Sequence, residues 1–309
     1  MKKIMFCITV SLTVCLLASA LFLCLYRPIK AIRFLEVAGP CPIPETVEYE
    51  IPQEIIDSVF GQKRKIYKIV SRRTLGYDKE LLEKFEMKKY RPLQSINDDI
   101  AAIYTTGNQK LSIYKDGTFS FCFIRVPPQG EFLRSSNEII KDAERYLKSK
   151  DLLPENFYQD GCSLIKQSGN AGTKITQMEP IFRCSIDGYE AYGSSYICVT
   201  YDSEGVLSVD SMYSGYEPDR TVSTISFEEA CALVKTKKAS ISYETEVTET
   251  PDKVVIDTAK LIYFDTRDYN EGGTHILPCY VFEGLAYVGD ETTKFQATVM
   301  AIPESMTTR

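Results

Sequence analysis

Ser226-Phe227-Glu228-Glu229 begins the stretch that decides the predicted fold. A serine followed three residues later by a glutamate is a capping box, in which each side chain bonds the backbone N–H of the other residue at the start of a helix. The apolar face of this helix consists of Phe227, Ala230, Cys231 and Val234. Three apolar segments with the composition of strands follow, at residues 254–264, 275–283 and 294–302. The sequence therefore predicts one helix followed by three antiparallel strands.

The same order occurs earlier in the chain, where Ser135-Ser136-Asn137-Glu138 forms a second capping box. The helix after it has apolar residues at spacings of three and four, namely Ile139, Ile140, Ala143, Tyr146 and Leu147. Strand-like segments follow at residues 181–186, 194–201 and 206–213. Before the helix, Lys115-Asp116-Gly117 predicts the turn of a hairpin between strands at 110–114 and 118–124.

This repeated unit predicts an α+β protein in which an N-terminal transmembrane helix precedes antiparallel sheets, each crossed by one helix, in two tandem modules. Little residue identity links the two halves, so one continuous domain is the alternative. Asp78 is expected to cap a further helix within the first module. The expected regions are a membrane segment at 1–27, a proline-rich spacer at 28–52, a first α+β region at 53–215 and a second at 216–309.

Residues 4–26 carry no charged side chain and follow Lys2 and Lys3. As a helix, this stretch would be about 35 Å long, enough to cross roughly 30 Å of hydrocarbon. Ala18-Ser19-Ala20 imitates a cleavage site, but the apolar run continues to Tyr26, which favours an uncleaved signal-anchor over a cleaved signal peptide. We expect a single-pass protein of the cell membrane whose C-terminal part is extracellular.

Small side chains recur at every fourth residue of this apolar segment, at Cys7, Ser11, Cys15 and Ser19. On a helix they form one stripe, which would let a second transmembrane helix approach closely. The stripe is therefore a candidate helix-packing surface, although small residues are also common in membrane segments that have no partner.

The composition excludes several classes of function. The chain has 309 residues, with 36 Lys and Arg against 42 Asp and Glu, and its net charge is −6. This acidic balance argues against a nucleic-acid-binding surface, which is normally basic. A single histidine excludes every mechanism or metal site that needs two.

Candidate catalytic groups fail on spacing. His275 and Cys279 lie four residues apart in a strand, which separates them by roughly 13 Å, too far for a Cys–His pair. The Ser-x-x-Lys matches at 112–115 and 163–166 lack the further motifs of the penicillin-recognising enzymes. No glycine-rich phosphate-binding motif is present in the sequence. We therefore predict no catalytic, cofactor-binding or metal-binding residue, no cofactor and no enzymatic activity.

The ten cysteines include no C-x-x-C pair, which argues against a zinc or thioredoxin motif. Four of them lie in apolar strand or helix patterns and are expected to fill the core: Cys122, Cys198, Cys231 and Cys279. The sequence leaves open whether any of the cysteines outside the apolar segment form disulfides.

Six tyrosines lie between residues 189 and 216. Tyrosines in sheets usually pack one ring face and leave the hydroxyl in water, but they are also favoured at protein interfaces. Tyr192 and Tyr216 are therefore the candidate interface residues.

The second helix-and-strands unit resembles a known module. Its motifs are Ser226-Phe227-Glu228-Glu229-Ala230, then Ile-Asp-Thr-Ala-Lys-Leu-Ile-Tyr-Phe at 256–264 and Ile-Leu-Pro-Cys-Tyr-Val-Phe-Glu-Gly at 276–284. These residues resemble the C-terminal module of the YycH/YycI-type accessory proteins and the related PepSY-like module. The single N-terminal span and the extracellular body match as well. The resemblance covers residues 220–302, and its motifs are mostly structural.

The resemblance implies a non-catalytic regulator that modulates a membrane sensor histidine kinase, or works with a related accessory protein, through transmembrane and ectodomain contacts. The alternative is a cell-surface PepSY-like module that inhibits a peptidase or binds an envelope ligand. An envelope hydrolase is disfavoured because the sequence lacks the catalytic groups. No nucleic-acid partner is expected.

Overall fold

The structure is a computed structural model that describes residues 29–30, 42, 44, 46–87, 90–93, 98–126, 132–169, 172–193, 195–236, 238–245, 247, 249–268, 274–303 and 306–308. The predicted membrane segment at 4–26, with the stripe Cys7, Ser11, Cys15 and Ser19, lies outside these residues. Within the described ranges, no helix combines the length and the apolar character needed to cross a membrane.

The helices are α2 (Gln53–Val59), α3 (Tyr77–Lys84), α4 (Ser136–Ser149), α5 (Phe227–Lys235) and the 3₁₀ turn η2 (Thr266–Asp268). The first strands are β1 (Ile29–Lys30), β2 (Thr46–Tyr49), β3 (Lys63–Val70), β4 (Arg91–Leu93), β5 (Ile100–Thr105), β6 (Gln109–Tyr114), β7 (Phe119–Phe123), β8 (Phe157–Gly169) and β9 (Gly172–Ile186). The later strands are β10 (Tyr189–Tyr192), β11 (Tyr196–Asp202), β12 (Gly205–Ser211), β13 (Gly215–Ser223), β14 (Ser240–Tyr243), β15 (Lys253–Asp265), β16 (His275–Val288), β17 (Glu291–Met300) and β18 (Thr307–Thr308).

The predicted fold class is wrong. The chain is mostly strand, and one 16-stranded mixed sheet runs through nearly all of it, instead of separate antiparallel sheets each crossed by a helix. Two strand pairs of this sheet are parallel, β2 with β15 and β10 with β15, and β1 with β18 form a separate two-stranded parallel sheet within the described residues. The prediction failed because strand pairing between segments distant in sequence leaves no local signal, and because β8 contains polar residues and glycine that hide its strand character.

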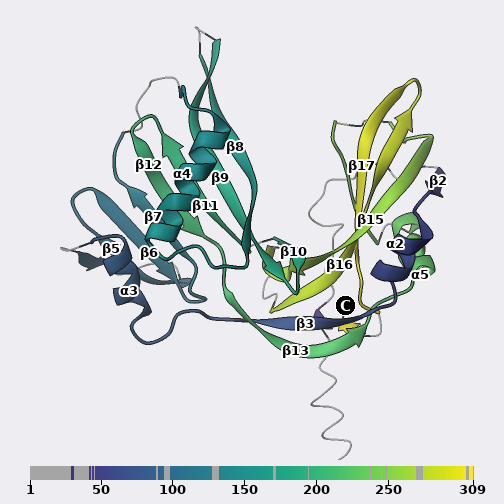
Figure 1. The fold of residues 1–309 in the computed structure, drawn as a ribbon, viewed down its shortest axis with the longest axis horizontal. Coiled ribbons are helices and arrows are strands. Elements are labelled where there is room, and N and C mark those ends of the chain that lie inside the picture. The colour runs from purple at the N-terminus through teal and green to yellow at the C-terminus, as the bar shows by residue number, and fades with distance from the viewer. Residues whose placement is uncertain are drawn as a thin grey trace, which may run out of the picture.

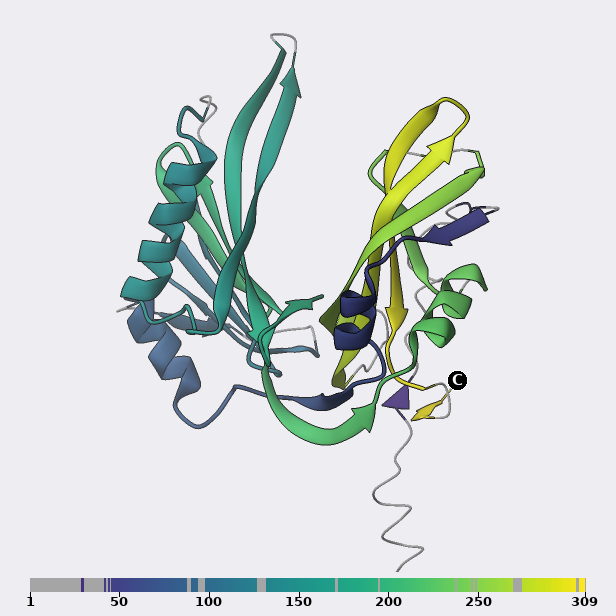
Figure 2. The same ribbon diagram turned by 45° about the vertical axis from the view of Figure 1, so that its right-hand side comes forward.

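Two lobes rise from a common base (Figures 1 and 2). Lobe 1 contains α3, α4, β4–β9, β11 and β12. Its core packs α3 and α4 on one face of the sheet, with Leu147, Phe121 and Val199 among its fully buried side chains. Lobe 2 contains β2, α2, α5 and β14–β17, and its core packs α2 and α5 on one sheet face around Phe282, Phe295 and Val234.

Three strands join the lobes. β3 and β13 pair with each other and pass below both lobes, and β10 pairs with β9 on one side and with β15 on the other (Figure 1). A junction core fills this base, with contributions from Tyr67, Cys184, Ile186, Ala191, Tyr263 and Ile276. Because shared strands continue the hydrogen bonding from one lobe to the next, edges that two separate modules would leave open are paired here.

The local predictions fare better than the fold class. Both capping boxes are confirmed, with Ser135 accepting from the N–H of Glu138 and Ser226 from that of Glu229. The helix cap predicted at Asp78 is wrong, because α3 begins after Gly76, which has a φ of 91°. Asp78 instead accepts two hydrogen bonds from Arg73 at 2.9 Å, and bonds to this guanidinium lower the pKa of the carboxyl. The division at residues 215 and 216 stays a prediction.

Candidate functional site

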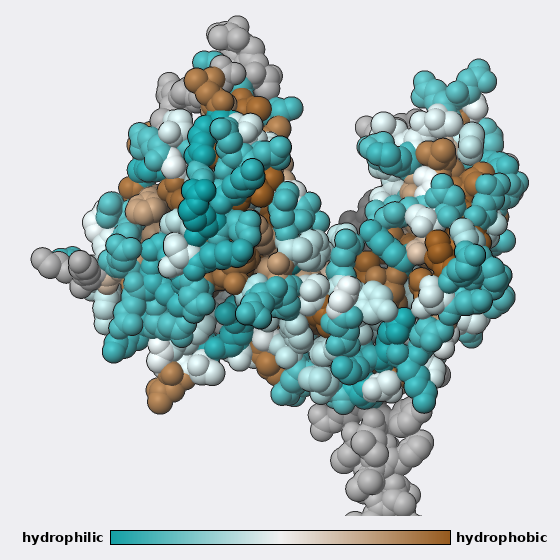
Figure 3. Space-filling model, in the orientation of Figure 1, coloured by the Kyte–Doolittle hydropathy of each residue, from teal (hydrophilic) through white to brown (hydrophobic). Residues whose placement is uncertain are grey.

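In each lobe one face of the sheet carries no helix, and these two faces lie opposite each other across a wide cleft. Figure 2 shows α3 and α4 on the outer side of lobe 1 and α5 on the outer side of lobe 2, so the opposite sheet faces look inward. The space-filling view shows the cleft open between the lobes, with hydrophilic side chains along much of its border (Figure 3). This cleft is the candidate functional site.

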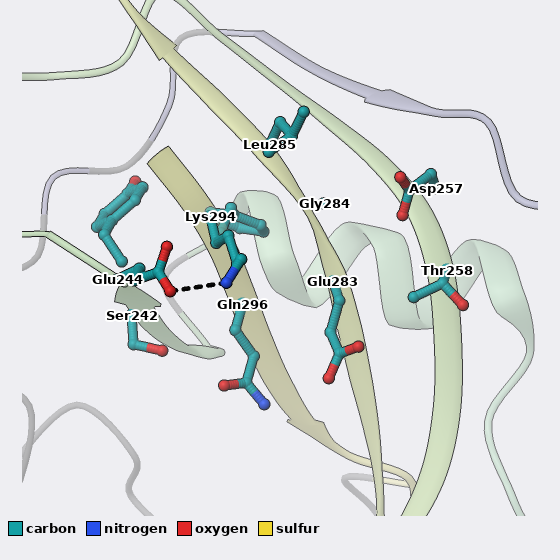
Figure 4. A pocket seen from close by; sticks show the side chains of 11 residues that line it. Ser242, Glu244, Asp257, Thr258, Glu283, Gly284, Leu285, Lys294 and Gln296 are labelled. Carbon is teal, nitrogen blue, oxygen red and sulfur yellow. Dashed lines mark hydrogen bonds and ion pairs between the residues drawn. The ribbon is translucent and has the colours of Figure 1, made fainter. Parts of the chain in front are cut away.

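A groove of about 600 Å³ lies on the lobe 2 wall of the cleft. Its floor is a polar row across four strands, in which Thr258 pairs with Glu283, Glu283 with Gln296, and Gln296 with Ser242. The neighbouring row places Leu285 opposite Val255 on one side and opposite Lys294 on the other. In Figure 4 these side chains stand on the near side of the strands and a helix passes behind them. A volume of this size is typical of ligand-binding pockets.

A β-bulge shapes one end of the groove. The register of β15 against β16 shifts between Ile256 and Thr258, and the extra residue, Asp257, is exposed along the groove. Gly284 makes this possible, because a Cβ at that position would lie 2.0 Å from the carbonyl oxygen of Val255. The Asp257 carboxylate has no hydrogen bond or ion pair to another described residue, so it is available to an occupant of the groove.

The remaining charges of the groove are held in pairs. Lys294 lies 2.7 Å from Glu244, and this pair is drawn in Figure 4. Lys260 lies 3.3 Å from both Glu190 and Glu283. Burial lowers the pKa of Lys260, but Tyr192 and the two carboxylates outweigh it, so the pKa lies above its ordinary value and the ammonium stays charged.

The cleft floor is built around β10, where the two sheet halves meet. The hydroxyl of Tyr192 donates to Glu190 at 3.0 Å, next to the Lys260 ion pairs of lobe 2. From lobe 1, the Arg183 guanidinium lies 5.2 Å from the centroid of the Tyr192 ring and binds Asp160. Tyr192 therefore contacts Arg183 of lobe 1 and Glu190, which in turn forms an ion pair with Lys260 of lobe 2.

Tyr158 carries an unused hydrogen-bonding group at the same floor. It stands opposite Arg183 in the β8–β9 ladder, and its hydroxyl oxygen is buried without a hydrogen-bond partner among the described residues. Burial, with the nearby charge of Glu190, raises the pKa of this hydroxyl. An unpaired buried hydroxyl of this kind costs free energy in the folded chain.

The lobe 1 wall is different, because its side chains are short and bonded to each other. Thr200 donates to Glu179 at 3.1 Å, and Ser208 lies 3.0 Å from Thr200 and 3.2 Å from Asp210. Cys122 on β7 is the cross-strand neighbour of Ser208 on β12. The hydroxyl groups of Thr200 and Ser208 on this wall are thus already bonded to neighbouring side chains.

A charged network holds the two lobes together beside this floor. Arg267, which follows β15, lies 2.7 Å from Asp265 and 2.6 Å from Asp116 in the β6–β7 turn of lobe 1. The Asp265 side chain is 1% exposed. Burial acts to raise the pKa of Asp116, but bonds from Thr118 and Ser214 and the charge of Arg267 prevail, so the pKa is lowered. The network thus fixes the β6–β7 turn of lobe 1 against the end of β15 in lobe 2.

The two tyrosines predicted as interface residues lie in different places. Tyr192 is half-buried on the cleft floor, as described above. Tyr216 packs on the junction core, with its ring 5.4 Å from that of Tyr67, and its hydroxyl accepts a bond from Asn156 at 3.0 Å. The interface role of both residues stays a prediction.

The other chemically reactive residues are distributed as follows. The six cysteines within the described ranges are free thiols; Cys198 and Cys279 are buried, as expected of core residues, while Cys122 and Cys231 are only partly buried. Burial raises the pKa of the Cys184 thiol to about 11, which makes it unreactive. His275 lies 3.7 Å from Asp219, and burial lowers the pKa of its imidazole. Over the same residues, no group of His, Cys, Asp and Glu side chains is suited to a metal ion.

The sequence did not reveal the groove. Asp257, Glu283 and Gln296 come from three strands and look like ordinary exposed positions of alternating patterns. The one available signal is Gly284 inside an otherwise apolar strand, since such a glycine often marks a bulge or a close backbone approach.

Comparisons with known proteins give limited information. No family model and no curated protein matches the sequence. The C-terminal domain of YpeB from Bacillus megaterium aligns with 76% of this chain and 94% of its own length, at 12% identity and a TM-score of 0.36. YycH from Bacillus subtilis aligns with 75% of this chain and 52% of its own, also at 12% identity and a TM-score of 0.36. These solved structures include a protein of the type that the C-terminal motifs resemble, but a TM-score of this size does not establish a common fold.

Proposed function

We propose that this chain is a non-enzymatic, protein-binding regulator and that the lobe 2 wall of the cleft is the surface that receives its partner. The observation that carries the proposal is the groove on a helix-free sheet face. Sheet faces in a folded protein are normally covered or fully solvated, and this one is hollowed and retains unused bonding groups.

The partner proposed is a membrane sensor histidine kinase or a related accessory protein, and the site of action is the outer face of the cell membrane. These two points rest on the C-terminal motifs and on the apolar segment 4–26 of the sequence. An inhibitor of a secreted peptidase is the alternative, and it would use the same cleft.

The test compares two arginine substitutions in the full-length, tagged chain. Leu285→Arg places a bulky charge on the groove wall, at a side chain that is 41% exposed, whereas Glu228→Arg places one on α5, on the opposite side of the sheet. We expect Leu285→Arg to lower co-purification of the sensor kinase from membranes and Glu228→Arg to leave it unchanged.

Equal recovery of the kinase with both variants and with the unsubstituted chain would contradict the proposed surface. If a peptidase co-purifies instead of the kinase, and only Leu285→Arg abolishes its recovery, the proposed surface is supported and the partner is the peptidase. Circular dichroism of both variants checks that the fold is intact.

A further inference from the structure

We infer that the occupant of the cleft is an extended segment of a partner protein that carries lysine or arginine side chains. This inference rests on the proposed function, because it names the chemistry of the partner that the same surface would receive.

The charge of the lobe 2 wall favours a basic occupant. Four carboxylates lie along it and the adjoining floor, at Glu190, Glu244, Asp257 and Glu283, against two ammonium groups, at Lys260 and Lys294. Each lysine already has a carboxylate within 3.3 Å, so neither is available to an acidic ligand. Asp257 forms no ion pair with a described residue. An arriving cation would therefore meet carboxylates that are only partly neutralised.

The facing wall adds to this charge. Glu179 and Asp210 of lobe 1 each accept a bond from a hydroxyl and have no ion pair to a described cation. Lys110, opposite Cys122 on the same wall, offsets one of these carboxylates, so a basic segment would be attracted more strongly by lobe 2 than by lobe 1. Charge complementarity of this kind selects a partner and speeds its association.

The shape of the site favours an extended segment over a globular surface. The groove follows the polar row from Thr258 to Ser242, and Glu283 of this row forms an ion pair with Lys260 next to the cleft floor. The walls on either side are sheet faces, with an open space between them (Figure 3).

The experiment measures binding of short synthetic peptides to the purified full-length chain by fluorescence anisotropy, at low and at high salt. The peptides alternate threonine with lysine, with glutamine or with glutamate. We expect the lysine peptide to bind most tightly, with an affinity that falls at high salt. The glutamate peptide should bind least.

Matched double variants locate the binding. Asp257→Lys with Glu283→Lys reverses two charges in the groove, and Glu54→Lys with Glu228→Lys makes the same change in net charge on α2 and α5. The groove variant should bind the lysine peptide roughly tenfold more weakly, and the helix variant should bind like the unsubstituted chain. Asp257→Asn with Glu283→Gln, which only neutralises, should give an intermediate loss.

If both lysine variants lose the same affinity for the lysine peptide, the peptide responds to net charge alone and the inference is overturned. Tighter binding of the glutamine or glutamate peptide than of the lysine peptide would also overturn it. If Leu285→Arg releases the partner from membranes while the charge variants change nothing, the protein-binding proposal survives and the basic segment is excluded.

Discussion

The two lobes have the same arrangement of helices on one face of a sheet, but the side chains on their helix-free faces differ. Each places a capped helix on one side of its sheet, and each turns the other side toward the cleft. In lobe 1 that side carries short hydroxyl side chains that bond each other, as Thr200 and Ser208 do. In lobe 2 it carries longer side chains around a groove, with Asp257 unbonded to any described residue. The hydroxyl groups of the lobe 1 face are bonded within the face, whereas the lobe 2 face also has a groove and a carboxylate with unused bonding capacity.

The largest expected effect comes from breaking the connection that sets the two faces opposite each other. Arg267→Ala would leave the buried carboxylate of Asp265 without its cation, and removal of one partner from such a pair typically costs about 3–5 kcal/mol. Urea unfolding of the variant should show this loss. Arg134→Ala, which removes an exposed partner of Asp142, is the control and should cost less than about 1 kcal/mol.

Acid should weaken the same connection. Since the pKa of Asp116 is lowered in the folded chain, its contribution to stability is present above the ordinary carboxyl pKa and is lost as the pH falls through the folded value. Asp116→Asn should remove that part of the acid sensitivity. An Arg267→Ala variant as stable as the Arg134→Ala control would contradict the role given to the network.

A smaller effect, of about 2–5 kcal/mol, is expected when either core is truncated. Leu147→Ala in lobe 1 and Leu261→Ala in lobe 2 each remove a buried side chain, at 0% and 5% exposure. Because one sheet runs through both lobes, each substitution should lower the same unfolding transition in calorimetry. Two separate transitions, each sensitive to one substitution only, would show that the lobes are independent domains.

The smallest effect compares the two caps. Ser135→Ala and Ser226→Ala each remove the side chain that accepts from the third residue of its helix, and each should cost about 1 kcal/mol. Thermal melting measures both losses, and replacement by aspartate should restore most of each. A loss in one variant alone would mean that the two helices do not contribute alike to their lobes.

These features also show what could be predicted from the sequence. Caps and tight turns are local, so the helices after Ser135 and Ser226 and the hairpin turn at Lys115-Asp116-Gly117 were found correctly. The cap at Asp78 failed because Arg73, five residues away, takes the carboxylate.

The fold class and the groove could not be predicted, because both depend on strand register. The joining of the lobes through β10 and through β3 with β13 brings together segments far apart in the chain. Asp257 lies on the groove because of one extra residue in β15, which only the pairing with β16 shows. Tyr192 was chosen for tyrosine content and lies on the cleft floor, while Tyr216, chosen in the same way, packs into the junction core.

Site-specific photo-crosslinking in intact cells tests the central claim most directly. A photoreactive amino acid replaces Leu285 on the lobe 2 wall in one variant and Glu228 on α5 in the other. The account predicts a crosslink from position 285 to a lysine- or arginine-bearing segment of the partner, and none from position 228. A partner crosslinked from position 228 and absent from position 285 would contradict it.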